Sequence, residues 1–232
     1  MAEATISETL SGRKQLRLRS GEADRMSTRA YNLTLTGLLA YGLLLNAVIV
    51  YYFSYPLLEA LQGVNTWLLL VGYMAPTLLG IFLAAKSQNP KVSFLGYNLV
   101  VLPLGVVLSL IASAVSVDVM VKAIALTGMV TLTMMLLALL RPQVFLGLGR
   151  TLFIALAVGI VAELVATFLM GYDGGLFDWF FVLLFSGYIG YDVAKSQAYP
   201  KTLDNAVDSA LDIYLDIIVL FIRLLNVLGR KD

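Results

Sequence analysis

The sequence predicts an all-α polytopic membrane protein, built as a bundle of seven transmembrane helices with the C-terminal helix at its centre. Composition is the first reason, because 59% of the 232 residues are hydrophobic and only 13% are charged. A soluble domain has roughly 45–50% apolar and about 25% charged residues, and no soluble fold of this length buries so much apolar surface. The second reason is a series of long apolar stretches separated by short connectors rich in proline and glycine.

Residues 1–29 precede the first apolar stretch and form a polar tail. The tail is too long and too mixed in charge to be the start of a signal peptide. We expect it to be mostly disordered and to lie on one side of the membrane. Its six basic residues are Arg13, Lys14, Arg17, Arg19, Arg25 and Arg29.

Five spans follow in order, each close to the roughly 20 residues that cross about 30 Å of hydrocarbon. Only the fifth contains a charged residue, Glu163. The expected spans are 30–53, 66–85, 92–117, 123–140 and 151–170. Breaks between spans are expected at Tyr55-Pro56, Asn89-Pro90, Arg141-Pro142 and Asp173-Gly174-Gly175.

The last two spans carry charge. Only thirteen uncharged residues separate Asp178 from Asp192, so span six takes at least one of these aspartates into the membrane zone. Span seven, about 207–228, contains three aspartates and Arg223. Each charge near a span centre costs roughly 2.5–3.5 kcal/mol on insertion scales, so this helix is best buried among the other six. The membrane domain is therefore 30–229, followed by a short tail, 230–232.

Lysine and arginine indicate the orientation. Basic residues follow spans two, four and six, whereas the opposite loops are acidic apart from Lys122. This predicts a cytoplasmic N-terminus. Seven spans then place Arg230 outside, against the rule, and a re-entrant seventh segment is the alternative. The basic loop residues are Lys86, Lys91, Arg141, Arg150, Lys195 and Lys201.

Cysteine and histidine are both absent. The absence of these residues excludes disulfides, thiol nucleophiles, catalytic triads that use histidine, and pH switches based on histidine. An intramembrane aspartyl protease would use two membrane aspartates, but span seven lacks a Gly-x-Gly-Asp motif and no Pro-Ala-Leu follows it. We therefore expect no enzyme activity and no cofactor, and the net charge of +1 gives no reason to expect a nucleic-acid partner.

Four aspartates recur at intervals of four residues, from Asp204 just before span seven to Asp216 within it, and on a helix they form one slowly drifting stripe. Asp204 and Asp208 are expected to be interfacial acids near the helix N-terminus, where the helix dipole favours negative charge. If the helix enters the membrane near Val207, Asp216 lies roughly 12–14 Å inside, at about 1.5 Å per residue. Ionisable groups at that depth are usually functional, so we interpret Asp216 as a functional residue. Asp212 lies between these positions.

Spans six and seven form an antiparallel hairpin around Tyr199-Pro200-Lys201. Residues equidistant from its turn meet, so Asp192 at the end of span six faces residues 211–216. Asp212 and Asp216 both satisfy this geometry. The alternative for Asp192 is an interfacial acid that pairs with Lys195.

Three more charged residues are candidates. Lys86 ends span two and acts either as a snorkelling anchor or as a counter-ion for the carboxylates. Glu163 has no obvious basic partner in its span, so it is either a hydrogen-bonded structural residue or part of an ion path. Arg223 is a possible secondary site residue.

Two motifs distinguish the C-terminal stretch, Tyr191-Asp192, which ends span six, and Ile213-Tyr214-Leu215-Asp216 in span seven. In these motifs above all, the chain resembles the Bax-inhibitor family, the transmembrane Bax inhibitor motif proteins, in a bacterial form. The likeness is specific over about 185–229 and extends over 30–229 in span count and loop spacing. It also includes Gly187-Tyr188-Ile189-Gly190 and Leu220-Phe221-Ile222-Arg223-Leu224-Leu225.

This resemblance implies a seven-helix fold with a central last helix and a pH-sensitive calcium leak, in the plasma (inner) membrane of a bacterium. It assigns the sensor to Asp192 and Asp216, and so favours Asp216 over Asp212. Bacterial members end helix two with an arginine beside this pair. Here Lys86 occupies the matching position and presents a point charge instead of a bidentate fork.

The predicted function is a passive calcium leak channel gated by protonation of the Asp192–Asp216 pair. The pair should titrate as a unit near neutral pH. Calcium takes six to eight oxygen ligands, so two carboxylates make a weak, transient metal site for a permeant ion. Calcium, protons and the lipid bilayer are the expected partners. The alternatives are an interaction protein that modulates a membrane protease or a stress or death pathway, and a proton-coupled transporter.

Overall fold

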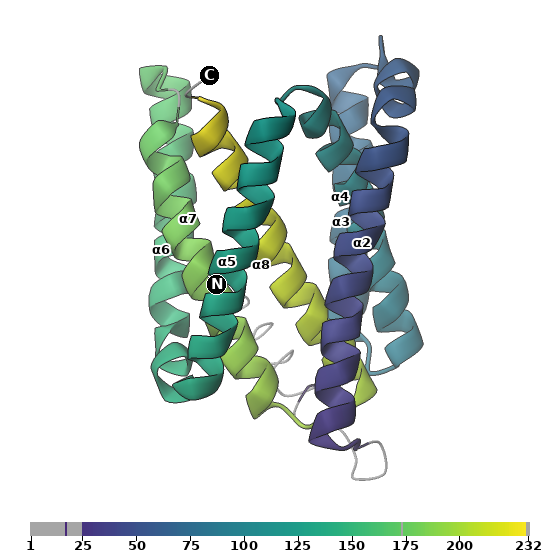
Figure 1. The fold of residues 1–232 in the computed structure, drawn as a ribbon, viewed down its shortest axis with the longest axis vertical. Helices are drawn as coiled ribbons and strands as arrows, with labels where there is room; N and C mark the ends of the chain where they lie inside the picture. The colour runs from purple at the N-terminus through teal and green to yellow at the C-terminus, as the bar shows by residue number, and fades with distance from the viewer. Residues whose placement is uncertain (1–16, 18–24, 173, 231–232) are drawn as a thin grey trace, which may run out of the picture. The chain divides into compact units, whose positions relative to one another are not determined.

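The structure is a computed structural model that describes residues 17, 25–172 and 174–230. The regular elements in this described part are seven α-helices. They are α2 (Thr28–Leu61), α3 (Thr66–Lys86), α4 (Pro90–Ser113), α5 (Val117–Leu140), α6 (Pro142–Met170), α7 (Gly175–Ala198) and α8 (Leu203–Gly229). Their order is visible along the colour gradient of Figure 1.

Six of the seven described helices, α2 to α7, are long and apolar enough to cross a membrane. This confirms the all-helical, multi-pass architecture. The six coincide with the first six predicted spans. Helix α8 does not meet the same criterion, which agrees with the charge that the sequence places in it, and its crossing of the membrane stays a prediction.

Helix starts are explained by side chains that cap free backbone N–H groups. Ser27 accepts a hydrogen bond from Ala30 N, and Asn89 accepts one from Lys91 N. Pro90 and Pro142 stand at the first helical positions, where a missing N–H costs nothing. The predicted breaks at 89–90, 141–142 and 199–201 are confirmed.

Two predicted boundaries are wrong. The break at Tyr55-Pro56 is absent, because α2 continues through Pro56 to Leu61. A membrane helix tolerates an internal proline when other groups satisfy the freed carbonyl, and Pro76 and Pro103 are likewise inside helices. Arg150 belongs to no loop, since α6 already begins at Pro142.

The chain divides into two compact units. The first contains residues 1–114 and 196–211, and the second contains 115–195 and 212–232. Helices α7 and α8 each begin in one unit and end in the other. Most of α8 is buried, including Asp208 and Asp216. Its predicted central position among the other helices stays a prediction.

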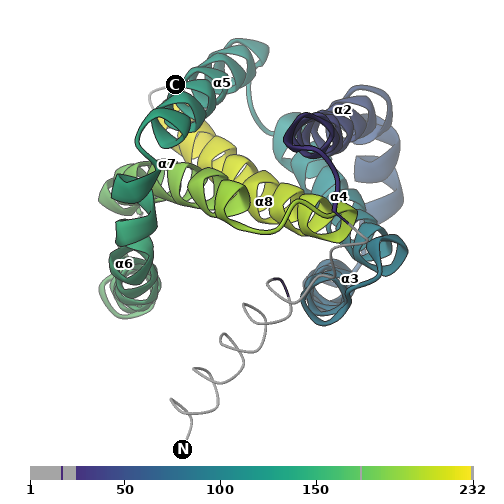
Figure 2. The same ribbon diagram turned by 90° about the horizontal axis from the view of Figure 1, so that it is seen from below.

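In the first unit, α4 packs against both α2 and α3, as Figures 1 and 2 show from two directions. Glycine makes the α3–α4 contact possible. A Cβ atom on Gly80 would lie 2.4 Å from the carbonyl oxygen of Gly96, so the two backbones touch there. Tyr97 of α4 adds a hydrogen bond of 2.8 Å to the backbone oxygen of Leu38 in α2.

In the second unit, α6 packs against α7 through a core of Leu152, Phe181 and Leu184. Glycines again face large side chains. A Cβ on Gly159 would lie 2.5 Å from the Phe180 ring, and one on Gly190 would lie 2.2 Å from the Phe145 ring. These contacts hold α7, which carries Asp192, in a defined position against α6.

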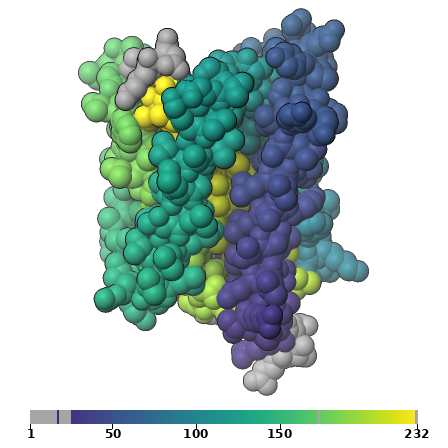
Figure 3. All heavy atoms as spheres, in the orientation of Figure 1, coloured from purple at the N-terminus to yellow at the C-terminus, as the bar shows by residue number. Residues whose placement is uncertain are grey.

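The outer helix surfaces are apolar. On α2, whose outer face is in view in Figure 3, Leu33 is 64% exposed and Leu44 is 65% exposed. On α6, Phe168 and Leu169 are each 80% exposed. Apolar side chains exposed along helices of this length are suited to contact with lipid.

Candidate functional site

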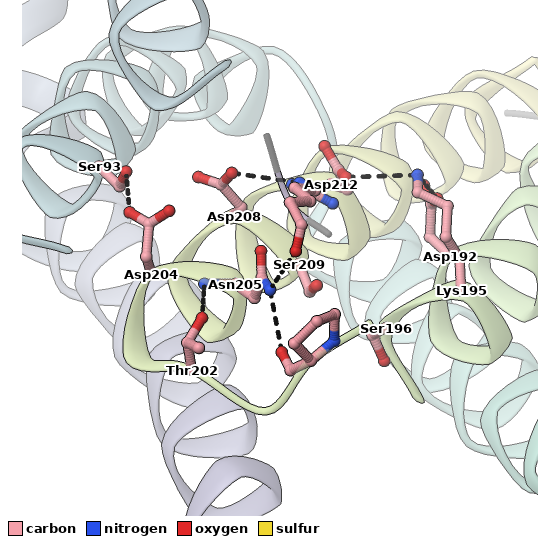
Figure 4. Close-up of polar contacts among 12 residues, drawn as sticks. Ser93, Asp192, Lys195, Ser196, Thr202, Asp204, Asn205, Asp208, Ser209 and Asp212 are labelled. Carbon is pink, nitrogen blue, oxygen red and sulfur yellow. Dashed lines mark hydrogen bonds and ion pairs between the residues drawn. The ribbon is translucent and has the colours of Figure 1, made fainter. Parts of the chain in front are cut away.

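Three carboxylates and one ammonium group gather in the second unit, from α7 and α8. Lys195 Nζ lies 2.5 Å from Asp192 Oδ1 in its own helix and 3.4 Å from Asp212 Oδ2 in α8. Figure 4 shows this lysine between the two aspartates. Asp216 belongs to the same group through its interactions with Asp192 and Asp212. We call these four residues the carboxylate cluster.

Helical spacing explains the cluster. Asp192 and Lys195 are three residues apart on α7 and therefore lie on one face. Asp212 and Asp216 are four apart on α8 and also share a face. The turn at 199–202 makes the two helices antiparallel neighbours, as the hairpin argument predicts. The structure does not favour one of Asp212 and Asp216 over the other as the partner of Asp192, since Asp192 interacts with both.

Asp192 and Asp216 lie close enough to influence each other electrostatically. A proton held by either carboxyl group would reduce the repulsion between two ionised acids. Asp216 is 6% exposed, and its Oδ2 has no hydrogen-bond partner in the described part of the chain. Tyr188, one turn before Asp192, also interacts with both acids.

The cluster brings three acids and one ammonium group together at largely buried positions. Buried charge is expensive, so the protonation of these acids affects how α7 and α8 pack. Within the described residues, no three acidic side chains are arranged to hold a metal ion together.

Lys86 lies at the last position of α3, with its Nζ 5.8 Å from the centre of the Phe82 ring. It belongs to the first unit, whereas the carboxylate cluster belongs to the second. Its role as a latch stays a prediction. The cation that contacts the acids directly is Lys195, which the sequence interpretation considered only as an interfacial partner of Asp192.

A second charged group in the same unit contains Glu163, Asp178 and Arg223. Arg223 binds Glu163 with two hydrogen bonds, of 2.5 and 2.9 Å, and Asp178 with one of 3.0 Å. Its guanidinium also stacks 4.3 Å from the centre of the Phe181 ring. Arg230 lies 3.1 Å from the other Asp178 oxygen. Glu163 therefore has a basic partner, sixty residues further along the chain, which the sequence interpretation did not identify.

The two remaining members of the stripe have partners in the first unit. Asp204 accepts a hydrogen bond of 2.7 Å from Ser93, and Asp208 forms an ion pair of 3.2 Å with Arg17. Figure 4 labels both aspartates at the start of α8. Asp208 is only 2% exposed, so it is not the open interfacial acid that its position near a helix end predicted.

Near this end, Lys201 in the α7–α8 turn donates to the backbone oxygens of Ser196 and Gln197. Its ammonium group also lies 4.6 Å from the centre of the Tyr31 ring. Burial lowers the pKa of Lys201 from its ordinary value. The turn that precedes the aspartate stripe is thereby fixed to the end of α7.

Together, the apolar helices and the charges within them define a multi-pass membrane protein with ionisable groups inside its bundle. The model of the family described as inhibitor of apoptosis-promoting Bax1 matches residues 24–232. The chain therefore belongs to the Bax inhibitor family. An uncharacterized membrane protein of Streptococcus pyogenes serotype M6 is 30% identical over 209 residues, covering 84% of this chain and 90% of the relative. One from serotype M3 is 29% identical over 206 residues, with the same coverage.

Proposed function

We propose that this protein is a calcium leak channel whose opening depends on protonation of the carboxylate cluster. The gathering of Asp192, Asp212 and Asp216 around Lys195 is the observation that carries the proposal. Burial disfavours the ionised form of these acids, so protons and calcium compete for the same oxygens. A site of this kind binds calcium weakly enough to release it again.

The proposed mechanism uses Asp192 and Asp216 as the sensor and gate, with Asp212 and Lys195 beside them. A proton shared by Asp192 and Asp216 joins α7 to α8, while loss of that proton makes the two helix faces repel. Lys195 reduces this repulsion, because its ammonium group contacts both Asp192 of α7 and Asp212 of α8. Lys86 is proposed as a further latch from the end of α3.

The proposal includes a seventh span formed by α8 and a cytoplasmic N-terminus in the bacterial plasma membrane. The buried stripe of α8 supports the first point, and the basic loops after the even-numbered spans support the second. No enzymatic step or bound cofactor is part of this function. The permeant ion is calcium, and protons act as the regulator.

Calcium flux from liposomes that contain only the purified protein tests the proposal, between about pH 5 and 8. Asp192→Asn and Asp216→Asn should each remove the pH-dependent transition near neutrality, because an amide neither ionises nor repels its neighbour. Asp118→Asn is the matched control. Asp118 pairs with Lys122 on an exposed face of α5, where the side chains are 69% and 59% exposed, and its loss should leave the profile unchanged.

Other outcomes identify the alternatives. An unaltered pH profile in both Asp192→Asn and Asp216→Asn excludes this pair as the sensor. Loss of the transition in Asp212→Asn with retention in Asp216→Asn moves the sensor by one helical turn. A wild-type protein without any flux favours an interaction protein that acts on a membrane protease or a stress or death pathway. Saturable flux driven by a proton gradient indicates a proton-coupled transporter.

A further inference from the structure

The start of α8 and the turn before it form a second polar site, in the first unit, that the proposed channel function does not use. Asp208 and Asn205 contribute from α8, and Tyr199 contributes from the turn. Arg17, from the N-terminal tail, is bound here. Its Nε lies 3.2 Å from Asp208 Oδ2, and its guanidinium carbon lies 5.1 Å from the centre of the Tyr199 ring.

The same site recognises the backbone of the tail as well as the side chain. The Asn205 side-chain amide donates hydrogen bonds of 3.0 Å to the backbone oxygen of Arg17 and 2.9 Å to that of Pro200. Figure 4 shows Asn205 between Thr202 and Asp208. One side chain therefore links the tail to the α7–α8 turn.

A separate contact joins the tail to the same turn. Met26 N donates a hydrogen bond of 2.7 Å to the backbone oxygen of Lys201. Arg25 and Thr202 form an isolated antiparallel bridge beside it. The chain is thus attached at 25–26 and again at Arg17, on residues that lie next to each other in the turn and the first turns of α8.

Burial makes the Arg17–Asp208 pair costly to open. The two side chains are 4% and 3% exposed. Removing one partner of a buried ion pair leaves an uncompensated charge, which is far more unfavourable than losing an exposed pair. The planar guanidinium also combines an ion pair with ring stacking, which lysine reproduces less well. These features are those of a specific site for a guanidinium group.

We propose that Asp208, Asn205 and Tyr199 form a guanidinium-binding site whose ligand is Arg17 of the same chain, and that its occupation restrains α8. The restraint acts on the helix that also carries Asp212 and Asp216. Occupied, the site holds the first turns of α8 against Arg17. Vacated, it leaves a buried acid without its counter-ion and frees α8 to move. The effect on ion flux rests on the proposed channel function, whereas the binding of Arg17 does not.

Limited trypsin digestion of the full-length protein in detergent tests the binding directly. Trypsin needs an extended, accessible chain around the arginine that it recognises. Cleavage after residue 17, followed by mass spectrometry, should be at least tenfold faster in Asp208→Asn and in Asn205→Ala than in the wild type. The Asp118→Asn control should match the wild type. Equal cleavage rates in all four proteins would overturn the site.

Folding is checked in parallel by thermal unfolding, and Asn205→Ala is the milder variant if Asp208→Asn does not fold. The charge exchange Arg17→Asp with Asp208→Arg provides a second check. It should recover at least half of the thermal stability lost in the Asp208→Arg single variant, because the ion pair is restored in reverse. No recovery would show that the two residues do not form a pair.

The regulatory step is tested by calcium flux from liposomes at fixed pH. Arg17→Gln should raise flux at least threefold, and Arg17→Lys should raise it less, because the charge is kept. Unchanged flux in Arg17→Gln, with an active wild type, would overturn the restraint. A wild type without flux would instead refute the channel function. The trypsin experiment would still decide, by itself, whether Arg17 occupies the site.

Discussion

Lys195 contacts two acids on two helices. Its ammonium group is 2.5 Å from Asp192 and 3.4 Å from Asp212, with the lysine side chain 23% exposed. Lys195→Met removes a positive group that contacts both of these acids. We expect this change to alter the pH at which calcium flux switches, measured in liposomes. An unchanged profile would show that the lysine only anchors the end of α7.

Lys86 gives a contrasting prediction at the same scale. If it is a latch, Lys86→Met should raise calcium flux at neutral pH without loss of thermal stability. Lys86→Arg should strengthen closure, because arginine pairs with carboxylates in a bidentate way. If flux and its pH profile do not change, Lys86 is a snorkelling anchor over Phe82.

Spacing from a turn can be calculated from residue numbers, so the sequence predicts that Asp192 lies near Asp212 and Asp216, as the structure has it; their role as a sensor stays a prediction. Sequence reasoning did not identify the partner of Glu163 or that of Asp208. Arg223 lies 60 residues from Glu163, and Arg17 lies 191 residues from Asp208. Local periodicity contains no information about contacts at such separations. An uncompensated acid inside a span was the available sign that a distant base must exist.

At the scale of elements, Arg223 joins α8 to α6 and α7. Arg223→Met leaves Glu163 and Asp178 without this shared cation, and breaking a buried ionic network typically costs about 3–5 kcal/mol. We expect a clear loss of thermal stability in detergent. The matched control is Lys122→Met on the exposed surface of α5, with an expected effect below about 1 kcal/mol. Similar losses in the two variants would argue against a structural role for Arg223.

The contact between α3 and α4 depends on the absence of side chains. A Cβ on Gly80 would lie 2.4 Å from the backbone of Gly96, whereas one on Gly72 of the same helix meets nothing within 4 Å. Gly80→Ala should therefore destabilise the fold by about 1–3 kcal/mol through overpacking. Gly72→Ala should be neutral or stabilising by about 0.5–1 kcal/mol. Thermal unfolding of both variants in one detergent measures the difference.

Six helices were predictable because hydrophobic length is a strong signal in a membrane protein. Proline was misleading in α2, where Pro56 lies inside a helix of 34 residues. The helix continues through Pro56, whereas a new helix begins at Pro90 and at Pro142. Pro90 follows an asparagine and Pro142 follows an arginine, but Pro56 follows Tyr55. Proline alone is therefore a weaker sign of a helix end here than proline with a polar residue before it.

At the scale of the whole molecule, membrane topology can be tested with single cysteines, because the chain contains none. Ser93 and Ser196 are poor positions, since they are 0% and 1% exposed. Gln62 and Gln88 lie on the exposed surface at opposite ends of α3. A cysteine at Gln88 should react with an impermeant reagent from the cytoplasmic side, and one at Gln62 from the outside.

A third cysteine at Asp232 distinguishes a spanning α8 from a re-entrant one. Reaction from the outside supports seven spans, and reaction from the cytoplasm supports a re-entrant segment. Labelling of Gln62 from the cytoplasm would contradict the entire proposed orientation. All three variants keep the charged residues of the carboxylate cluster unchanged.

The ion pair between Arg17 and Asp208 also has a consequence for biosynthesis. These residues are 191 positions apart, so the base is made long before its acid. At roughly 5–20 residues per second, ribosomes need about 10–40 s to synthesise the intervening chain. The arginine has therefore already been synthesised when the charged helix α8 emerges from the ribosome. Synthesis of α8, rather than membrane insertion of the earlier helices, is the event that permits this contact.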